Sequence, residues 1–139
     1  MSADENRAVV RRWVEAWNEK DLNAAEELLG PDYVRHDANL PEVVGPQAER
    51  QFVAGVIAAF PDLHLQTEQL VAEDDLVVIR LTVRGTHRAE FMGVPPSDRQ
   101  VKFQAVDIYR LSDAKIAEQW VVTDILGLLQ QLGAVPSGG

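Results

Sequence analysis

The sequence predicts an α+β domain whose helices pack on one face of a curved antiparallel sheet. Two observations predict this class. Apolar residues recur at helical spacing in the first half of the chain, and the second half consists of β-rich runs separated by short polar turns. Helices grouped early and hairpin-linked strands grouped late are typical of α+β folds. The expected order is helix, helix, strand, helix, four strands, helix.

Two helices are expected at the start of the chain. Apolar residues at helical spacing between Val9 and Trp17 indicate the first, and Ser2 with Glu5 fits a capping box at its beginning. The second is expected from about Leu22 to Leu29, with Asp21 placed to cap it.

A strand and a third helix follow. Gly30-Pro31 is expected to end the second helix, and Tyr33–Asp37 reads as a strand. Pro46 stands where a first helical residue is favoured, and a buried apolar stripe continues from there to Phe60.

The second half contains the main strands. Their expected ranges are Leu63–Val71, Leu76–Thr86, Val101–Leu111 and Lys115–Thr123. The connection from Arg88 to Gln100 is longer, and we expect it to cover an opening. A last helix begins near Asp124, whose carboxylate is expected to cap it, and ends at Gly133. Residues 1–135 are thus expected to form a single domain, and residues 136–139 a flexible tail.

Composition narrows the classes of function. The 139 residues include 13 Lys and Arg against 22 Asp and Glu, a formal net charge of −9, which disfavours nucleic acid and anionic membranes as partners. The absence of cysteine excludes thiolate catalysis and disulfides, and three scattered histidines without ligand spacing give no expectation of a metal site. No apolar signal core is visible, so a cytoplasmic location is expected.

Alternation along Val101–Leu111 places a carboxylate on an apolar face. Phe103, Asp107 and Tyr109 share the face that is apolar enough to be buried. A buried carboxylate needs a partner, or its pKa rises until it holds its proton. Asp107 is therefore a candidate acid or base.

The strand at Tyr33–Asp37 has two mixed faces. Tyr33, Arg35 and Asp37 share one face, and Val34 and His36 share the other. Periodicity leaves open which of the two faces inward. Asp37 is either an acid/base group, or a residue that begins a turn and whose charge a nearby arginine neutralises.

Helices can cover only one side of the sheet. If Trp120, Val122, Val106 and Ile108 lie on the other side, they form an apolar patch. We therefore expect a homodimer through the open sheet face.

Several segments between Val9 and Gly133 form a recognisable set. They are Pro31–Asp37, Phe60-Pro61-Asp62, Gly85-Thr86-His87, Phe91–Arg99, Asp107–Arg110 and Trp120…Asp124…Gln131-Leu132-Gly133. Together they resemble the SnoaL-like polyketide cyclases. The resemblance implies a cone-shaped fold like that of nuclear transport factor 2, with a deep pocket. It also implies cofactor-free intramolecular aldol closure of polyketide esters, with a cavity carboxylate as acid and base.

The sequence departs from that family at the carboxylate. The family's acid/base position, three residues before the Asp that precedes the last helix, is Val121 in this chain, and a histidine of the cyclases falls on Asp107. Ketosteroid isomerases share the cone. Their base corresponds to Asp37, their protonated aspartate to Asp107 and their oxyanion tyrosine to Trp13.

Two functions therefore stay open. The first is a cofactor-free enzyme that moves a proton on a small hydrophobic carbonyl compound, leading to ring closure or isomerisation. The second is a non-catalytic module that binds a small molecule, which the valine at position 121 favours. The candidate catalytic residues are Asp107, Asp37, His36 and His87, with His87 alternatively orienting a loop. The candidate substrate-binding residues are Trp13, Trp17, Tyr33, Arg35, Phe60, Phe91, Gln119 and Val121. Core packing is the alternative for the aromatic residues at helical spacing, and it is favoured for Trp17 and Phe60.

Overall fold

The structure is a computed structural model that describes residues 2–136. The helices are α1 (Ala3–Glu19), α2 (Ala24–Leu28), α3 (Pro46–Ala59) and α4 (Ile125–Gln131). The strands are β1 (Leu29–Asp37), β2 (Val43–Val44), β3 (His64–Glu73), β4 (Leu76–Thr86), β5 (Gln100–Ser112) and β6 (Lys115–Thr123). The expected α+β order is confirmed, with the short β2 added. Residues 137–139 of the expected tail lie outside the described residues.

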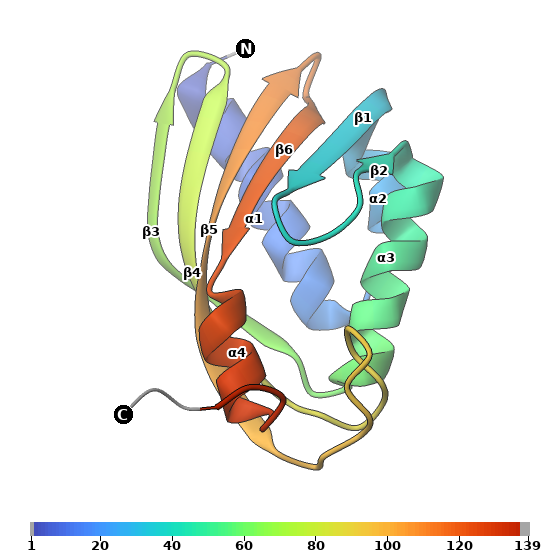
Figure 1. Ribbon diagram of the computed structural model, residues 1–139. Coiled ribbons are helices and arrows are strands. Elements are labelled where there is room, and N and C mark those ends of the chain that lie inside the picture. The colour runs from blue at the N-terminus through green and yellow to red at the C-terminus, as the bar shows by residue number, and fades with distance from the viewer. Residues whose placement is uncertain (1, 137–139) are drawn as a thin grey trace.

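The sheet is curved and mixed, with the strand order β2-β1-β6-β5-β4-β3 (Figure 1). Its β3-β4-β5-β6 part is the expected antiparallel meander. The sheet differs from the expected fully antiparallel arrangement where β1 pairs with β6 in parallel. A hairpin forces neighbouring strands to be antiparallel, but α3 and four strands separate β1 from β6 in the chain, so this pair is free to align in parallel.

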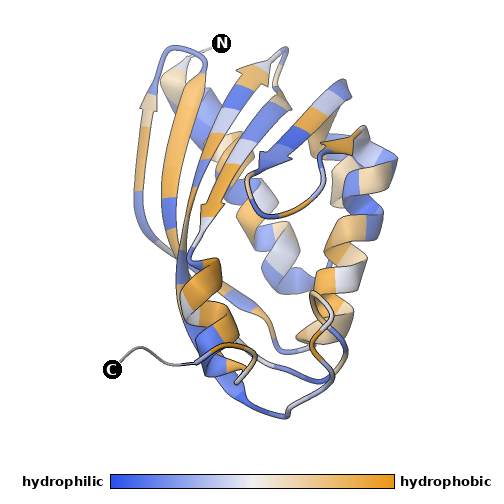
Figure 2. Cartoon of the chain, in the orientation of Figure 1, coloured by the Kyte–Doolittle hydropathy of each residue, from blue (hydrophilic) through white to orange (hydrophobic). Residues whose placement is uncertain are grey.

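The core lies between the sheet and the helices. α1 packs against β3 and β4, and α3 packs against β1 (Figure 1). On β4 the buried residues alternate from Val77 to Leu81, as a sheet with one covered face requires. Figure 2 shows the resulting mixture of apolar and polar positions along the strands. Among residues 2–136, no helix is long and apolar enough to cross a membrane.

Helix caps follow the sequence in two places and depart from it in a third. Ser2 and Glu5 form the expected capping box of α1, and the Asp124 side chain accepts a hydrogen bond from the Gly127 backbone N at 2.9 Å. α2, however, is shorter than expected: it begins at Ala24, and the Asp21 side chain accepts from the Asn23 backbone N at 3.2 Å, ahead of the helix.

Gly30 and Pro31 lie inside β1 instead of ending a helix. The register of β1 against β6 shifts between Leu29 and Val34, so this stretch is an irregular part of the ladder. Proline has no backbone N–H to donate to a ladder, and it is tolerated at this position because the ladder is interrupted there.

A second register shift, between β5 and β6, determines which residues of β6 face the core. The register between β5 and β6 shifts after Arg110, so Leu111 pairs with Ile116. Ile116 is therefore buried, although strict alternation would place it on the outer face with Trp120. Beyond the shift, Gln119 and Val121 face inward, as buried residues.

Candidate functional site

A cavity opens between the concave face of the sheet and α3. Its volume is about 100 Å³, enough for several water molecules. The polar residues that line it are Arg35, Asp37, Asp107, Tyr109, Gln119 and Thr123. The apolar lining includes Trp17, Phe52, Phe60, Phe91, Phe103 and Val121. The lining, mostly apolar with a few convergent polar groups, has the composition of a small-molecule site.

The polar groups stand in two neighbouring cross-strand rows on the inner face. In the first row, Val121 on β6 pairs with Asp37 on β1 and with Asp107 on β5. In the second row, Gln119 pairs with Arg35 and with Tyr109. The parallel pairing of β1 with β6 thus brings β1 side chains into the site.

Asp107 is a cavity-lining carboxylate with one oxygen free of hydrogen bonds. Its Oδ2 accepts hydrogen bonds from Gln119 Nε2 at 3.2 Å and from Tyr109 Oη at 3.3 Å. Its Oδ1 is buried and has no hydrogen-bond partner among the described residues. Burial raises the pKa of Asp107 to about 6, and Arg35 and the two hydrogen bonds limit the rise. A carboxylate of this kind is suited to exchange a proton near neutral pH.

Arg35 supplies the positive charge of the site. Its NH1 donates to Asp37 Oδ2 at 3.4 Å, and its Nε lies 3.8 Å from Glu49 Oε2. The guanidinium also lies 4.1 Å from the centre of the Phe52 ring, in a cation–π contact. Arg35 is therefore held from three sides while it lines the cavity.

Asp37 makes both of the structural contacts that were the alternative to catalysis, a turn and an ion pair with an arginine. Its Oδ1 accepts from the backbone N of Asn39 at 2.8 Å, which forms the turn after β1. Its Oδ2 accepts from Arg35. Because both oxygens are engaged, Asp37 is less available to take a proton than Asp107.

A chain of hydrogen bonds extends from Asp107 to a buried residue that the sequence analysis did not single out. Gln119 Oε1 lies 2.7 Å from Tyr33 Oη, and Tyr33 Oη lies 2.9 Å from Glu49 Oε2. Glu49 stands on the buried stripe of α3, three and seven residues before Phe52 and Val56. A glutamate at that helical spacing was the signal that could have identified it.

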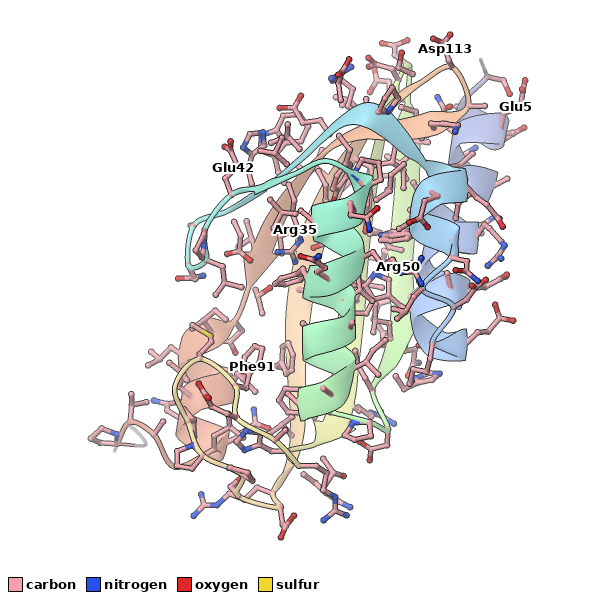
Figure 3. All side chains as sticks on the ribbon, turned by 90° about the vertical axis from the view of Figure 1, so that its right-hand side faces the viewer. Glu5, Arg35, Glu42, Arg50, Phe91 and Asp113 are labelled. Carbon is pink, nitrogen blue, oxygen red and sulfur yellow. The ribbon has the colours of Figure 1, made fainter. Side chains whose placement is uncertain are left out.

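Aromatic residues form the wall away from the carboxylates. Phe60 packs edge-on against Phe91 at 5.3 Å between ring centres. Figure 3 shows Arg35 beside α3 and Phe91 on the loop below it, between α4 and α3. Trp17, Phe60 and Phe91 line the cavity, and Phe60 is also part of the buried core.

Two proposed histidines lie away from the cavity. His36 is on the outer face of the sheet, where it contacts Glu118 and Glu42 and stacks on Trp120, because alternation turns it opposite to Arg35. His87 is fully buried, with its Nδ1 2.9 Å from Ser97 Oγ. It fixes the loop after β4 and does not line the cavity.

Two proposed ligand contacts also require correction. Trp13 is buried in the core and does not line the cavity, because α1 turns it toward α2 and α3 and leaves Trp17 at the cavity. Its indole N–H has no partner within residues 2–136. Tyr33 lies behind the lining, where it touches Gln119 and Glu49.

The described part of the chain contains no group of three or more His, Asp or Glu side chains placed to hold a metal ion. What the site offers is a carboxylate with one free oxygen, a guanidinium, an amide and an apolar wall. This arrangement can remove a proton from carbon beside a carbonyl group and stabilise the resulting negative charge.

Comparisons with known proteins agree with this description. A family model described as SnoaL-like polyketide cyclase matches residues 7–132. The nogalonic acid methyl ester cyclase of Streptomyces nogalater is 31% identical, over 86% of this chain and 91% of that protein. The aklanonic acid methyl ester cyclase DnrD of Streptomyces peucetius is 29% identical, over 90% of this chain and 88% of that protein.

Solved structures show the same architecture. AclR of Streptomyces galilaeus, a candidate hydroxylase, superimposes with a TM-score of 0.88 and 36% identity, over 99% of this chain and 87% of that one. A candidate SnoaL-like polyketide cyclase from Jannaschia sp. CCS1 gives a TM-score of 0.89 and 26% identity, over 96% and 95%.

Proposed function

The chain belongs to the SnoaL-like polyketide cyclase family, and we propose that it is a cofactor-free enzyme that removes a proton beside the carbonyl group of a small hydrophobic compound. The observation that carries this proposal is the free, buried Oδ1 of Asp107 in the wall of the cavity. A desolvated carboxylate oxygen without a partner is costly unless a ligand engages it.

Asp107 is the proposed general base. Because the pKa of Asp107 is about 6, the carboxylate is ionised at neutral pH and still basic enough to accept a proton from an activated carbon. The hydrogen bonds from Gln119 and Tyr109 hold Oδ2, which leaves Oδ1 to take the proton.

Arg35 is the proposed partner of the enolate oxygen, in place of the Trp13 indole. The guanidinium lines the cavity, and its Nε makes no hydrogen bond to any of the described residues. A fixed positive charge in a site with little water stabilises a developing oxyanion strongly. Asp37 and Phe52 keep the guanidinium in place.

The reaction balances with one carboxylate. Asp107 takes the α-proton, and the enolate carbon attacks a second carbonyl carbon of the same molecule. The alkoxide that forms then takes the proton back from Asp107. For an isomerisation, the proton returns instead to a different carbon of the substrate. Neither route requires an oxidant or a reductant.

The valine at the family's acid/base position fits this proposal. Val121 pairs directly with Asp107, so a carboxylate is still present at the next strand of the same row. Paired side chains in antiparallel strands have Cβ atoms about 4.5–5.5 Å apart. The proposed base therefore lies one strand away from the family's acid/base position, and it still lines the cavity.

The alternative is a binding module without chemistry, which the same valine favours. The two are separated by incubating the protein with aklanonic acid methyl ester and nogalonic acid methyl ester, the compounds named for its relatives. Conversion of either ester to a ring-closed product of unchanged mass supports the enzyme. Saturable binding without conversion supports the module, and absence of binding rejects both for this substrate class.

We also propose an oligomeric state, partners and a location for the enzyme. The outer face carries Val106, Ile108, Trp120 and Val122, of which Val122 is 68% exposed. We expect a second copy of the chain to cover this patch, giving a homodimer. The net charge of −9 argues against nucleic acid and anionic membranes as partners, and we expect a cytoplasmic location.

A further inference from the structure

Glu49 is a buried acidic residue that the proposed reaction does not use. It is fully buried on α3, with Oε2 2.9 Å from Tyr33 Oη and 3.8 Å from Arg35 Nε. Its Oε1 has no hydrogen-bond partner in the described part of the chain. A carboxylate placed in this way is expensive to keep ionised.

The charges around Glu49 do not balance if every acid is ionised. One guanidinium, that of Arg35, would face the carboxylates of Asp37, Glu49 and Asp107. The other polar groups facing Glu49 are uncharged. They are Tyr33 on β1, Tyr109 on β5 and Gln119 on β6.

The neighbouring helix does not change this balance. On α2, Glu26 is paired with Arg50 at the surface, and both side chains are well exposed. Burial, which outweighs the effect of Arg35, raises the pKa of Glu49 above its usual range. A neutral Glu49 removes one of the two excess negative charges.

The hydrogen-bond donors lead to the same conclusion. Tyr33 has a single hydroxyl proton, and its Oη lies 2.7 Å from Gln119 Oε1. A carbonyl oxygen can only accept, so Tyr33 donates to Gln119. With the Gln119 amide in this orientation, the one hydroxyl proton serves Gln119, so Tyr33 Oη accepts from Glu49 across the 2.9 Å contact, and a carboxyl group donates only when it is protonated.

We propose that Glu49 is a neutral carboxylic acid whose hydrogen bond to Tyr33 directs a one-way chain through Gln119 and so keeps an amide N–H facing Asp107. Glu49 is thereby a positioning residue for the base, a role that rests on the proposed function. Gln119 Nε2 faces Asp107 Oδ2 at 3.2 Å and Tyr109 Oη at 3.1 Å.

Ionising Glu49 reverses the chain. Tyr33 then donates to Glu49 and accepts from the amide group of Gln119, which turns the Gln119 carbonyl oxygen toward Asp107. Two acceptors repel unless one of them carries a proton, so Asp107 would have to be protonated. Glu49 and Asp107 are therefore coupled, with the proton on Glu49 when Asp107 is the base.

The test needs no substrate. Side-chain carboxyl ¹³C shifts of Glu49 and Asp107 are followed by NMR in the wild-type protein from about pH 5 to about pH 8. We expect Asp107 to titrate, with Glu49 keeping the shift of a protonated acid at neutral pH. An ionised Glu49 at pH 7 overturns the inference.

Two variants test the direction of the chain. Glu49→Gln keeps a neutral donor to Tyr33, so the titration midpoint of Asp107 should stay at the wild-type value; a lower midpoint overturns the inference. Tyr33→Phe removes the donor to Gln119, so the midpoint should rise; an unchanged midpoint overturns the chain. Glu26→Gln is the control for removing a surface carboxylate near α3.

These results are independent of the proposed reaction. If the titrations agree with the chain and no substrate is converted, the proposed function fails and the coupling stands. If substrate is converted and Glu49 is ionised, the inference fails and the function stands. The wild-type titration decides the matter even if a variant does not fold.

Discussion

Val121 lies between Asp37 and Asp107 in one row of the sheet, paired with the first on β1 and with the second on β5. The row alternates a carboxylate, a methyl-bearing side chain and a carboxylate along the inner face. Because the residues on both sides of Val121 are known, substitutions can test which position in the row must carry the carboxylate.

The first prediction moves the carboxylate across the row. Asp107→Val should lower the rate of α-proton removal by about 10²–10⁴-fold, the usual contribution of a general base. Adding Val121→Asp to that variant restores a carboxylate to the same part of the cavity, and we expect at least about a tenfold recovery of the rate. Steady-state kinetics measure it, with Val121→Asn on the Asp107→Val background as the uncharged control. Equal rates for the two double variants would contradict the prediction.

The second prediction concerns stability and pH. The pKa of Asp107 is about 6 in the folded protein and near 3.8 in the unfolded chain, so the folded state binds this proton more tightly. The stabilising contribution is complete below the lower value and is lost as the pH rises through the higher one. Asp107→Asn should therefore be more stable than wild type at pH 8, by roughly 1–3 kcal/mol.

Urea unfolding at pH 4 and at pH 8 measures this difference. The gain from Asp107→Asn should shrink toward zero at the lower pH, where Asp107 is protonated in the folded state. Glu15→Gln removes an exposed carboxylate of α1 and is the matched control. If Asp107→Asn is less stable than wild type at pH 8, the ionised Asp107 does not destabilise the folded protein.

The third prediction concerns Arg35. Its positive charge lowers the pKa of Asp107, so Arg35→Met should move the pH midpoint of activity upward as well as lowering kcat. Arg35→Lys keeps the charge and should leave the midpoint closer to that of wild type. Arg50→Met, on the surface of α3, is the control. A pH midpoint unchanged in Arg35→Met would show that the guanidinium does not act on Asp107.

The fourth prediction concerns the outer face. Val122→Glu places a charge in the exposed patch beside Trp120 and should convert the dimer to a monomer. Light scattering at micromolar concentration measures the mass. Leu126→Glu changes an equally exposed apolar residue of α4 and should stay dimeric. A wild-type protein of monomeric mass rejects the dimer outright.

Local sequence signals predicted most of the fold. The capping box at Ser2, the proline that begins α3 and the alternation of β5 each depend on neighbours only a few residues away. The parallel pairing of β1 with β6 depends on residues far apart in the chain. No local pattern carries that information.

The site residues also divide into those that local sequence patterns predict and those that only the fold determines. Alternation placed Asp107 on the inner face, but it left open which face of β1 points inward. The pairing of Arg35 with Gln119 decides that question, and it also turns His36 outward. Glu49 was missed because a charged residue on a helix usually faces solvent, and only the fold shows that Tyr33 and Arg35 meet it in the core.

Proton–deuterium exchange at the α-carbon of β-keto esters and cyclic ketones tests the central claim most directly. It requires only the first proton transfer, so it does not depend on the identity of the natural substrate. The wild-type protein should catalyse exchange with a rate that rises with pH through about 6, and Asp107→Asn should lose at least about 100-fold of it. Exchange that stays at the buffer rate for every compound that binds, or that is equal in the two proteins, would contradict Asp107 as the base.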